Sequence, residues 1–162
     1  MRFVFRAPQE ADLAGVEKLL MQIQQLHVDM RPDIYQPMSQ MLTQELWRET
    51  VERNCALVAC VCESGESKQS EQIVGYAEWM IREYQSPTHV RRKVLFVDTM
   101  VVDKDWHRKG IGGQLFDRIR QLAAELGVDG IELQVNARNQ NAKQMYEHYG
   151  FTEKSINMEL PL

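Results

Sequence analysis

The segment WHRKGIGGQLF, residues 106–116, places basic side chains and bare backbone where an apolar helical pattern begins. Its basic residues are Arg108 and Lys109, and its glycines are Gly110, Gly112 and Gly113. The first turn of a helix offers unpaired N–H groups and the positive end of the helix dipole. Because glycine has no Cβ, a phosphate can approach those N–H groups closely. The segment predicts a pyrophosphate-binding loop, and the alternative is a glycine turn with basic neighbours by chance.

The spacing excludes two common phosphate-binding loops. A Walker loop ends in Gly-Lys-Ser/Thr, whereas Gly113 is followed by Gln114 and Leu115. A dinucleotide-binding fingerprint needs a third glycine where Leu115 stands. The hypothesis of an enzyme that acts on nucleotide phosphates is therefore disfavoured. Magnesium-dependent binding of ATP would support that hypothesis again.

The three cysteines are poor candidates for chemistry. Cys55 directly precedes an apolar run that contains Cys60 and Cys62. Because Cys60 and Cys62 are two residues apart, they share one face of the strand expected there. A zinc site needs a tighter pair and a second ligand pair, so no metal is expected. The sequence also offers no Ser or Cys nucleophile beside a base. Buried thiols in a reducing compartment are the better interpretation.

The pattern around these residues predicts a mixed α/β fold with one central, mostly antiparallel sheet and helices on both faces. Strands are expected over 1–7, 56–62, 73–84, 94–102, 130–135 and 152–160, with a polar hairpin loop over 63–72. Helices are expected from Glu10, from Ser39 to about Arg53 with Ser39 as N-cap, from near Gly112 to Gly127, and over 136–149, closed by Gly150.

Whole-chain properties are those of one globular domain. The chain has 162 residues, 44% of them hydrophobic and 26% charged. The net charge of −4 and the pI near 5.6 argue against nucleic acid as the main partner. The start of the sequence has no signal-peptide pattern, and no stretch approaches the length of a membrane span. We therefore expect a cytoplasmic protein that binds neither nucleic acid nor membrane.

Two motifs together resemble those of the GNAT superfamily of acetyl-CoA-dependent N-acetyltransferases. The segment His107–Gly112 is similar to the family's Gln/Arg-x-x-Gly-x-Gly/Ala signature, with histidine in place of the first residue. The segment NQNAKQMYEHYGF, residues 139–151, is similar to its Asn-x-x-Ala-x-x-x-Tyr-x-x-x-Gly-Phe segment. The resemblance extends over residues 94–151, and residues 1–53 match only in layout.

This resemblance implies a single GNAT-like domain over residues 1–162. Its expected activity is acetyl transfer from acetyl-CoA to a primary amine by direct attack. The implied acetyl-CoA-binding residues are Met100, Val101, Val102, His107, Arg108, Lys109, Gly110, Ile111, Gly112, Gly113, Asn139 and Tyr146. A main-chain N–H near Met100 would face the thioester oxygen. Asn139 is expected to bind the pantetheine arm, to cap its helix, or both.

Three residues are candidates for proton transfer. Tyr146 is the candidate general acid for the departing thiolate, whereas Tyr149 is expected to pack. Asp98 and Glu78 are rival candidate bases, and a water chain is a third possibility.

The acceptor, a small-molecule or peptide amine, is expected to meet His27, Asp33 and Tyr35. For His27, and likewise for Tyr146, Asp98 and Glu78, a purely structural role stays open. The resemblance also allows a homodimer. A non-catalytic acyl-CoA-binding sensor with the same fold is the alternative function.

Overall fold

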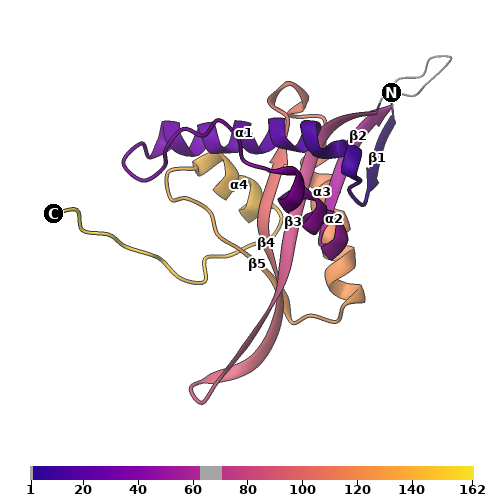
Figure 1. The fold of residues 1–162 in the computed structure, drawn as a ribbon. Coiled ribbons are helices and arrows are strands. Elements are labelled where there is room, and N and C mark those ends of the chain that lie inside the picture. Colours follow the sequence, from indigo (N-terminus) through magenta and orange to yellow (C-terminus); the bar gives the residue numbers. More distant parts are fainter. Residues whose placement is uncertain (1, 63–70) are drawn as a thin grey trace.

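The computed structural model describes residues 2–62 and 71–162, and their strands form one five-stranded sheet in the order β1-β2-β3-β4-β5 (Figure 1). The strands are β1 (Arg2–Arg6), β2 (Ala56–Cys62), β3 (Glu71–Ser86), β4 (His89–Val102) and β5 (Gly130–Leu133). Neighbouring strands are antiparallel, except that β5 runs parallel to β4. The expected mostly antiparallel sheet is confirmed. The polar loop expected over 63–72 falls mainly outside the described residues.

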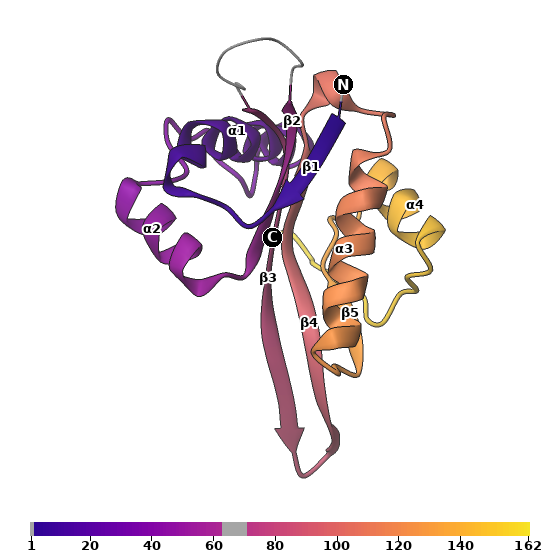
Figure 2. The same cartoon turned by 90° about the vertical axis from the view of Figure 1, so that its right-hand side faces the viewer.

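Helices cover both faces of the sheet, as expected. They are α1 (Leu13–Met30), α2 (Gln44–Arg53), α3 (Ile111–Glu125) and α4 (Gln140–His148), with short 3-10 turns at Glu10–Asp12 and Lys104–Trp106. Figure 2 shows the sheet nearly edge-on, with α1 and α2 on one side and α3 and α4 on the other. None of the helices in the described part of the chain is long and apolar enough to cross a membrane.

Helix α2 begins at Gln44, so the expected start at Ser39 is wrong. The Glu17 carboxylate accepts hydrogen bonds from the main-chain N–H groups of Met41 and Leu42, both at 2.8 Å. Those bonds hold the segment before α2 outside a helix. Thr43 takes the N-cap position instead, and its hydroxyl accepts a hydrogen bond from the N–H of Leu46.

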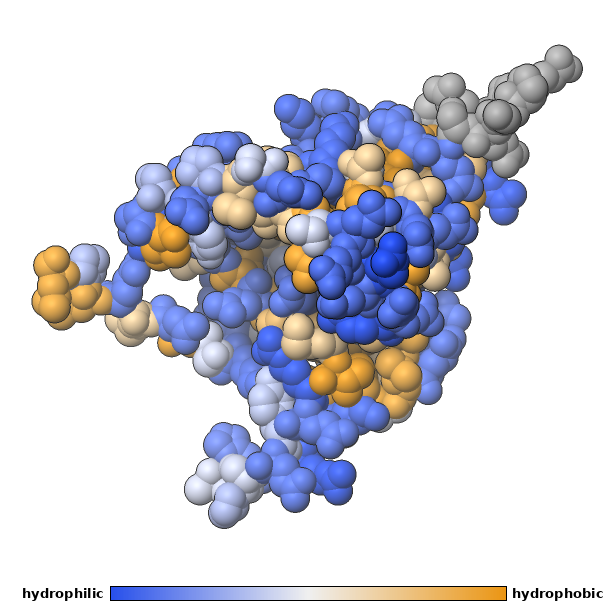
Figure 3. Space-filling view, viewed as in Figure 1, coloured by the Kyte–Doolittle hydropathy of each residue, from blue (hydrophilic) through white to orange (hydrophobic). Residues whose placement is uncertain are grey.

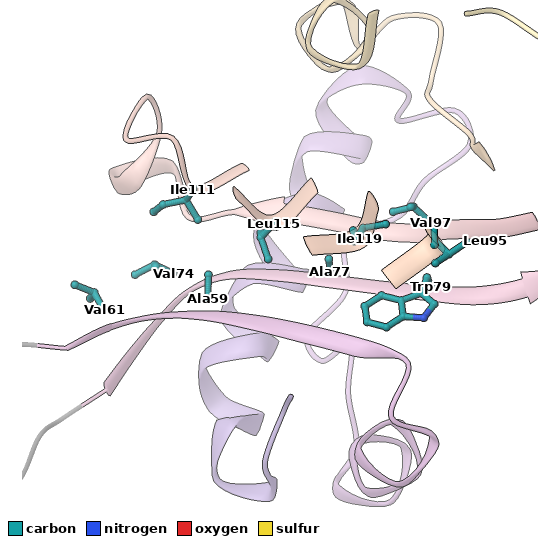
Figure 4. Close-up of a cluster of buried hydrophobic side chains, with 11 residues drawn as sticks. Ala59, Val61, Val74, Ala77, Trp79, Leu95, Val97, Ile111, Leu115 and Ile119 are labelled. Atoms are coloured by element: carbon teal, nitrogen blue, oxygen red, sulfur yellow. The ribbon is translucent and has the colours of Figure 1, made fainter. Parts of the chain in front are cut away.

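Two apolar clusters form the core, one on each face of the sheet. The cluster under α3 contains Leu115 and Ile119, which pack on Ala77 and Leu95 of the strands (Figure 4). The cluster under α1 and α2 is built around Val16, Leu19, Trp47 and Tyr76, all at most 1% exposed. Cys60 lies buried in this second cluster, where loss of solvation raises the pKa of its thiol to about 12.

A β-bulge interrupts β4 at Asp98. Glu78 pairs with Thr99 and Trp79 pairs with Val97, so Asp98 is the extra residue between them. The bulge shifts the alternation of β4, because Val97 before it and Met100 after it both pack toward the α3 cluster. Asp98 itself is exposed on the α1 side.

The expected last strand, Thr152–Leu160, is wrong for the described residues. This segment follows α4 as extended chain without any strand partner and leaves the body of the molecule (Figure 1). All of its side chains are exposed. Its alternating pattern is that of a strand, but a strand exists only where a neighbour supplies hydrogen bonds.

Candidate active site

The glycine loop joins β4 to α3 through two left-handed residues. Arg108 has φ +61°, and Gly110, the N-cap of α3, has φ +76°. Left-handed backbone is uncommon for a side chain such as arginine and persists only where surrounding contacts enforce it. Together the two residues bring the chain into the first turn of α3. The expected phosphate loop therefore lies at a helix N-terminus.

Asp103 anchors the start of this loop. Its side chain is 1% exposed, accepts a hydrogen bond from the N–H of Asp105, and pairs with the Lys18 ammonium at 2.7 Å. Its own N–H donates to the Val74 carbonyl. Burial alone would raise the pKa of Asp103, but the Lys18 and Asp105 hydrogen bonds outweigh it and the pKa is lowered. The loop is thus tied to both α1 and β3.

Packing does not require glycine at position 112. A Cβ built there would meet only Val102 Cγ2 at 3.8 Å and the Tyr149 hydroxyl oxygen at 3.9 Å, which are ordinary contacts. Glycine also weakens a helix by up to about 1 kcal/mol relative to alanine. The fold gains nothing from this glycine, whereas a ligand lying on the backbone would need it.

The side chains of the loop take different positions. The Nε2 atom of His107 lies 3.0 Å from the Val102 carbonyl oxygen, so this ring braces the loop. The ammonium of Lys109 lies 4.2 Å above the Trp106 ring in a cation–π contact. His107, the residue that departs from the family motif, therefore contributes to the loop through its contact with β4.

One edge of β4 is free beside the loop. β4 pairs with β5 only from Val94 to Val97, whereas its residues up to Val102 pair with β3 on the other side. Within the described chain, the β5 side of β4 from Asp98 to Val102 therefore has no strand. The Val102 carbonyl is taken by the side chains of Gln22 and His107. The main chain around Met100 and Val101 is left facing this gap.

Helix α4 and its C-cap residue carry two tyrosines, Tyr146 and Tyr149, on the α3 side of the sheet. The Tyr146 ring contacts Phe151 edge-on, and burial raises the pKa of its phenol to about 12. Tyr149 stacks on Phe116 with 4.9 Å between ring centroids. Its hydroxyl oxygen also lies 3.4 Å from the position of a Cβ on Gly113. Sequence reasoning expected packing alone for Tyr149 and missed its approach to the loop.

Asn139 is the N-cap of α4. Its side-chain oxygen accepts a hydrogen bond from the N–H of Ala142 at 3.1 Å. The capping half of the expectation for this residue is confirmed. Its other expected role, binding the pantetheine arm, stays a prediction.

An open cavity of about 320 Å³ lies on the α1 side of β4. It is lined by His27, Tyr35, Arg82, Phe96, Asp98, Gln134 and Asn136. His27 stacks on Tyr35 with 4.9 Å between ring centroids, and burial lowers its pKa, which leaves the imidazole neutral at pH 7. The Arg82 guanidinium lies 3.3 Å above the Phe96 ring centroid. Three of the expected residues, His27, Tyr35 and Asp98, are thus brought together.

Two other expected residues lie in ion pairs away from this lining. Asp33 forms a bidentate pair with Arg31, whose hydrogen bonds lower the pKa of Asp33 to about 2. Glu78 accepts hydrogen bonds from Arg53 at 2.9 Å and from the Tyr76 hydroxyl at 2.8 Å. Both of its oxygens already have donors. The local sequence gave no sign of the Arg53 partner, because Arg53 and Glu78 are 25 residues apart.

The described residues form no metal site, and their second cavity lies away from the glycine loop. Among them, no three or more His, Cys, Asp or Glu side chains gather as metal ligands would. A second cavity, of about 270 Å³, lies between Asn54 and the C-terminal half of α3. Its polar lining comes from side chains such as Arg118, Gln121 and Glu125, far along α3 from the glycine loop.

Comparison with known proteins identifies a family. The model of the "Acetyltransferase (GNAT) family" matches residues 20–151. A mycothiol acetyltransferase from Beutenbergia cavernae is 36% identical over 58 residues, which are 36% of this chain and 20% of that protein. The chain thus aligns with about a fifth of the length of that curated relative.

Solved structures share the fold over nearly the whole chain. A variant of the BH1408 protein from Bacillus halodurans superposes with a TM-score of 0.88 at 27% identity, covering 98% of this chain and 99% of that one. An aminoglycoside N-acetyltransferase in complex with CoA superposes with a TM-score of 0.65 at 12% identity, covering 98% and 95%. At that identity the second similarity shows the fold alone.

Proposed function

Because the chain belongs to the acetyltransferase (GNAT) family, we propose that it transfers an acetyl group from acetyl-CoA to a primary amine. The observation that carries the proposal is a line of three features along β4, between the glycine loop and the cavity. It begins at the bare helix N-terminus around Gly112 and follows the unpaired edge of β4. It ends at the cavity beside Asp98.

The loop fits the diphosphate of acetyl-CoA. The first N–H groups of α3 and the helix dipole favour an anion, and Gly112 and Gly113 let it approach. The Tyr149 hydroxyl, beside Gly113, can donate a further hydrogen bond to it. The pantetheine arm would then follow the free main chain around Met100 and Val101. An N–H at this edge would stabilise negative charge on the thioester oxygen.

The chemistry is a direct transfer without an acyl-enzyme. The neutral amine attacks the thioester carbon, a C–N bond forms, and the C–S bond breaks. The amine's proton leaves to Asp98, directly or through water, because both oxygens of the rival Glu78 are already hydrogen-bonded. Tyr146 gives its phenolic proton to the departing sulfur. Its pKa of about 12 keeps that proton in place at neutral pH.

The cavity favours an acceptor that carries both an amine and an anionic group. Asp98 supplies a negative charge next to the bulge, whereas Arg82 supplies a positive charge fixed over Phe96. Of the described carboxylates, none lies within ion-pair distance of Arg82. An amino acid or an amino-sugar phosphate has the required pair of charges.

Two measurements test the function. Calorimetric titration with acetyl-CoA, CoA and magnesium ATP should give micromolar affinity for the CoA species alone. A thiol-release assay over amino acids, amino-sugar phosphates and polyamines should then give turnover with the first two classes. Arg82→Gln should raise KM for those acceptors, with Arg91→Gln on the same hairpin as the control.

Each outcome separates the alternatives. CoA binding without turnover on any amine would favour a non-catalytic acyl-CoA sensor. No CoA binding would remove the proposal altogether. Turnover with polyamines alone would keep the enzyme but contradict the role of Arg82.

A further inference from the structure

The cavity of about 270 Å³ beside the C-terminal half of α3, called the α3 cavity below, has a built apolar floor. Residues at the ends of β1 and α2, on β2 and β3, and on α3 contribute to its lining. Trp79 belongs to the apolar cluster under α3, and Leu57 and Leu122 pack against that cluster. The cavity is therefore the open end of this core. None of its lining residues belongs to the surface assigned to acetyl-CoA.

The Trp79 indole is almost completely buried, but its N–H group has no acceptor among the described residues. Trp79 is 6% exposed. Trp47, the other core tryptophan, shows the usual arrangement, because its N–H donates to the carbonyls of Gln9 and Glu10. No fully buried side-chain nitrogen of the described chain lacks a partner, so the Trp79 N–H reaches the surface, at the cavity that its ring lines. Figure 4 shows this nitrogen on the side of the ring away from Ala77.

Arg118, on the α3 wall of the cavity, is a second donor that the described chain leaves without a charged partner. None of the described carboxylates lies within ion-pair distance of its guanidinium. Glu125, about two turns further along α3, accepts a hydrogen bond from Gln121 instead. A carboxylate can accept hydrogen bonds from a guanidinium and an indole N–H at the same time. The two donors therefore favour an anionic group in this cavity.

The chain's own apolar tail lies elsewhere. Ile156, Met158, Leu160 and Leu162 are exposed, and Figure 3 shows apolar side chains at the end of this segment standing clear of the body. In Figure 1 the C-terminus lies on the opposite side of the molecule from α2 and α3. The tail therefore leaves the α3 cavity open to a separate molecule.

We propose that the α3 cavity binds a small carboxylic acid with an apolar body. The carboxylate lies between the Trp79 N–H and the Arg118 guanidinium, and the apolar body packs on Leu57 and Leu122. The reverse orientation is disfavoured, because Glu125 and the negative end of the helix dipole lie at the last turn of α3. The cavity is smaller than pockets for drug-sized ligands, so a short chain such as hexanoate suits it.

Nuclear magnetic resonance tests the site without acetyl-CoA or an acceptor. The chain has three tryptophans and so three indole N–H resonances. That of Trp79 is identified by sequential assignment and by its loss in Trp79→Phe. Hexanoate should shift this resonance downfield in a saturable manner, because the N–H gains a charged acceptor. A Trp79 resonance that does not move at millimolar hexanoate would overturn the proposal.

Three related compounds separate the two parts of the ligand. Acetate lacks the apolar body, whereas 1-hexanol and hexylammonium lack the carboxylate. Each should require at least about tenfold higher concentration than hexanoate for the same shift of the Trp79 resonance. Equal shifts with 1-hexanol would mean apolar partition alone and would contradict the role assigned to Arg118.

One variant and one matched control test the position of the anion. Arg118→Gln should raise the Kd for hexanoate at least about tenfold. Arg48→Gln removes the same charge from α2, outside the lining, and should leave the Kd unchanged. Both arginines are exposed, so the fold should tolerate either change. Equal effects of the two variants would contradict a site at Arg118.

A titration in the presence of CoA tests whether the site is separate from the surface assigned to acetyl-CoA. The Kd for hexanoate should be the same with and without CoA, because no residue of the glycine loop lines the α3 cavity. Competition between hexanoate and CoA would place hexanoate on the acetyl-CoA surface and would overturn the proposal.

Discussion

Individual side chains at the site differ in what they can do, and the two tyrosines of α4 illustrate this. Both follow the same amphipathic pattern, and both contact an aromatic ring, Tyr149 that of the buried Phe116 and Tyr146 that of the half-buried Phe151. Burial raises the pKa of both phenols, and Tyr146 is the more deeply buried of the two, whereas the Tyr149 hydroxyl points to the glycine loop. In the proposed reaction, the first gives a proton to the departing sulfur and the second contacts a phosphate.

Replacing Tyr146 with Phe should separate turnover from binding. The ring keeps its edge contact with Phe151, so the fold and the affinity for CoA should be nearly unchanged. Loss of the proton donor should lower kcat by about 10²-fold. Steady-state kinetics and calorimetry on one preparation measure both quantities. Wild-type turnover would show that Tyr146 only packs.

Replacing Gly112 with Ala should weaken CoA binding without harming the fold. A Cβ at this position meets no atom closer than 3.8 Å, so the free energy of unfolding should be unchanged or higher by up to about 1 kcal/mol. The same methyl group stands where a diphosphate would approach the backbone. Urea denaturation measures the change in the free energy of unfolding, and CoA titration measures the change in affinity. Unchanged CoA affinity would remove the loop from the binding site.

At the scale of elements, the same substitution has the opposite effect on stability in α1. A Cβ on Gly15 would lie 2.7 Å from Cβ and Cγ1 of Ile73, so α1 could not keep its distance from β3. Gly15→Ala should therefore lower the free energy of unfolding by about 1–3 kcal/mol, despite the better helix propensity of alanine. Urea denaturation of Gly15→Ala and Gly112→Ala, measured side by side, compares their free energies of unfolding. Equal stability of the two variants would contradict the close packing of α1.

The ion pair between Lys18 of α1 and Asp103 at the glycine loop predicts that the stability of the fold depends on pH. The pKa of Asp103 is lower in the folded protein than its ordinary value of 3.8, so its ion pair with Lys18 contributes stability above that value. The contribution should be lost as the pH falls below about 4 through the lower folded pKa. Asp103→Asn should therefore be less stable than wild type at pH 7, and the difference should shrink toward pH 2. Urea midpoints across this range measure it, and a constant difference would contradict the linkage.

Most elements could be predicted because their signals are local. Gly127 and Gly150 end α3 and α4 in left-handed backbone, and Asn139 caps α4, as their positions indicated. The start of α2 could not be predicted, since it depends on Glu17, more than twenty residues upstream. The pairing of Glu78 with Arg53 is equally non-local. Alternation indicated a strand over Thr152–Leu160, but alternation does not show whether a neighbouring strand is there to pair with it.

At the scale of the whole molecule, the sheet separates two cores that should contribute independently to stability. Leu19 and Leu115 are both 0% exposed, one under α1 and the other under α3. Each Leu→Ala substitution should lower the free energy of unfolding by about 2–5 kcal/mol. The double variant should show the sum within about 0.5 kcal/mol, because the two sites share no contacts. A larger coupling in this double-mutant cycle would mean that the sheet transmits strain between its faces.

The two-sided core has a consequence for how such a chain can diversify over evolution. The surface assigned to acetyl-CoA depends mainly on the cluster under α3, and the cavity wall supplied by α1 rests on the other cluster. Mutations that reshape α1, α2 and their connection can therefore accumulate while the α3 side stays intact. A duplicated gene could acquire a new acceptor by drift on one face alone. Selection would then act on two nearly separate halves of one domain.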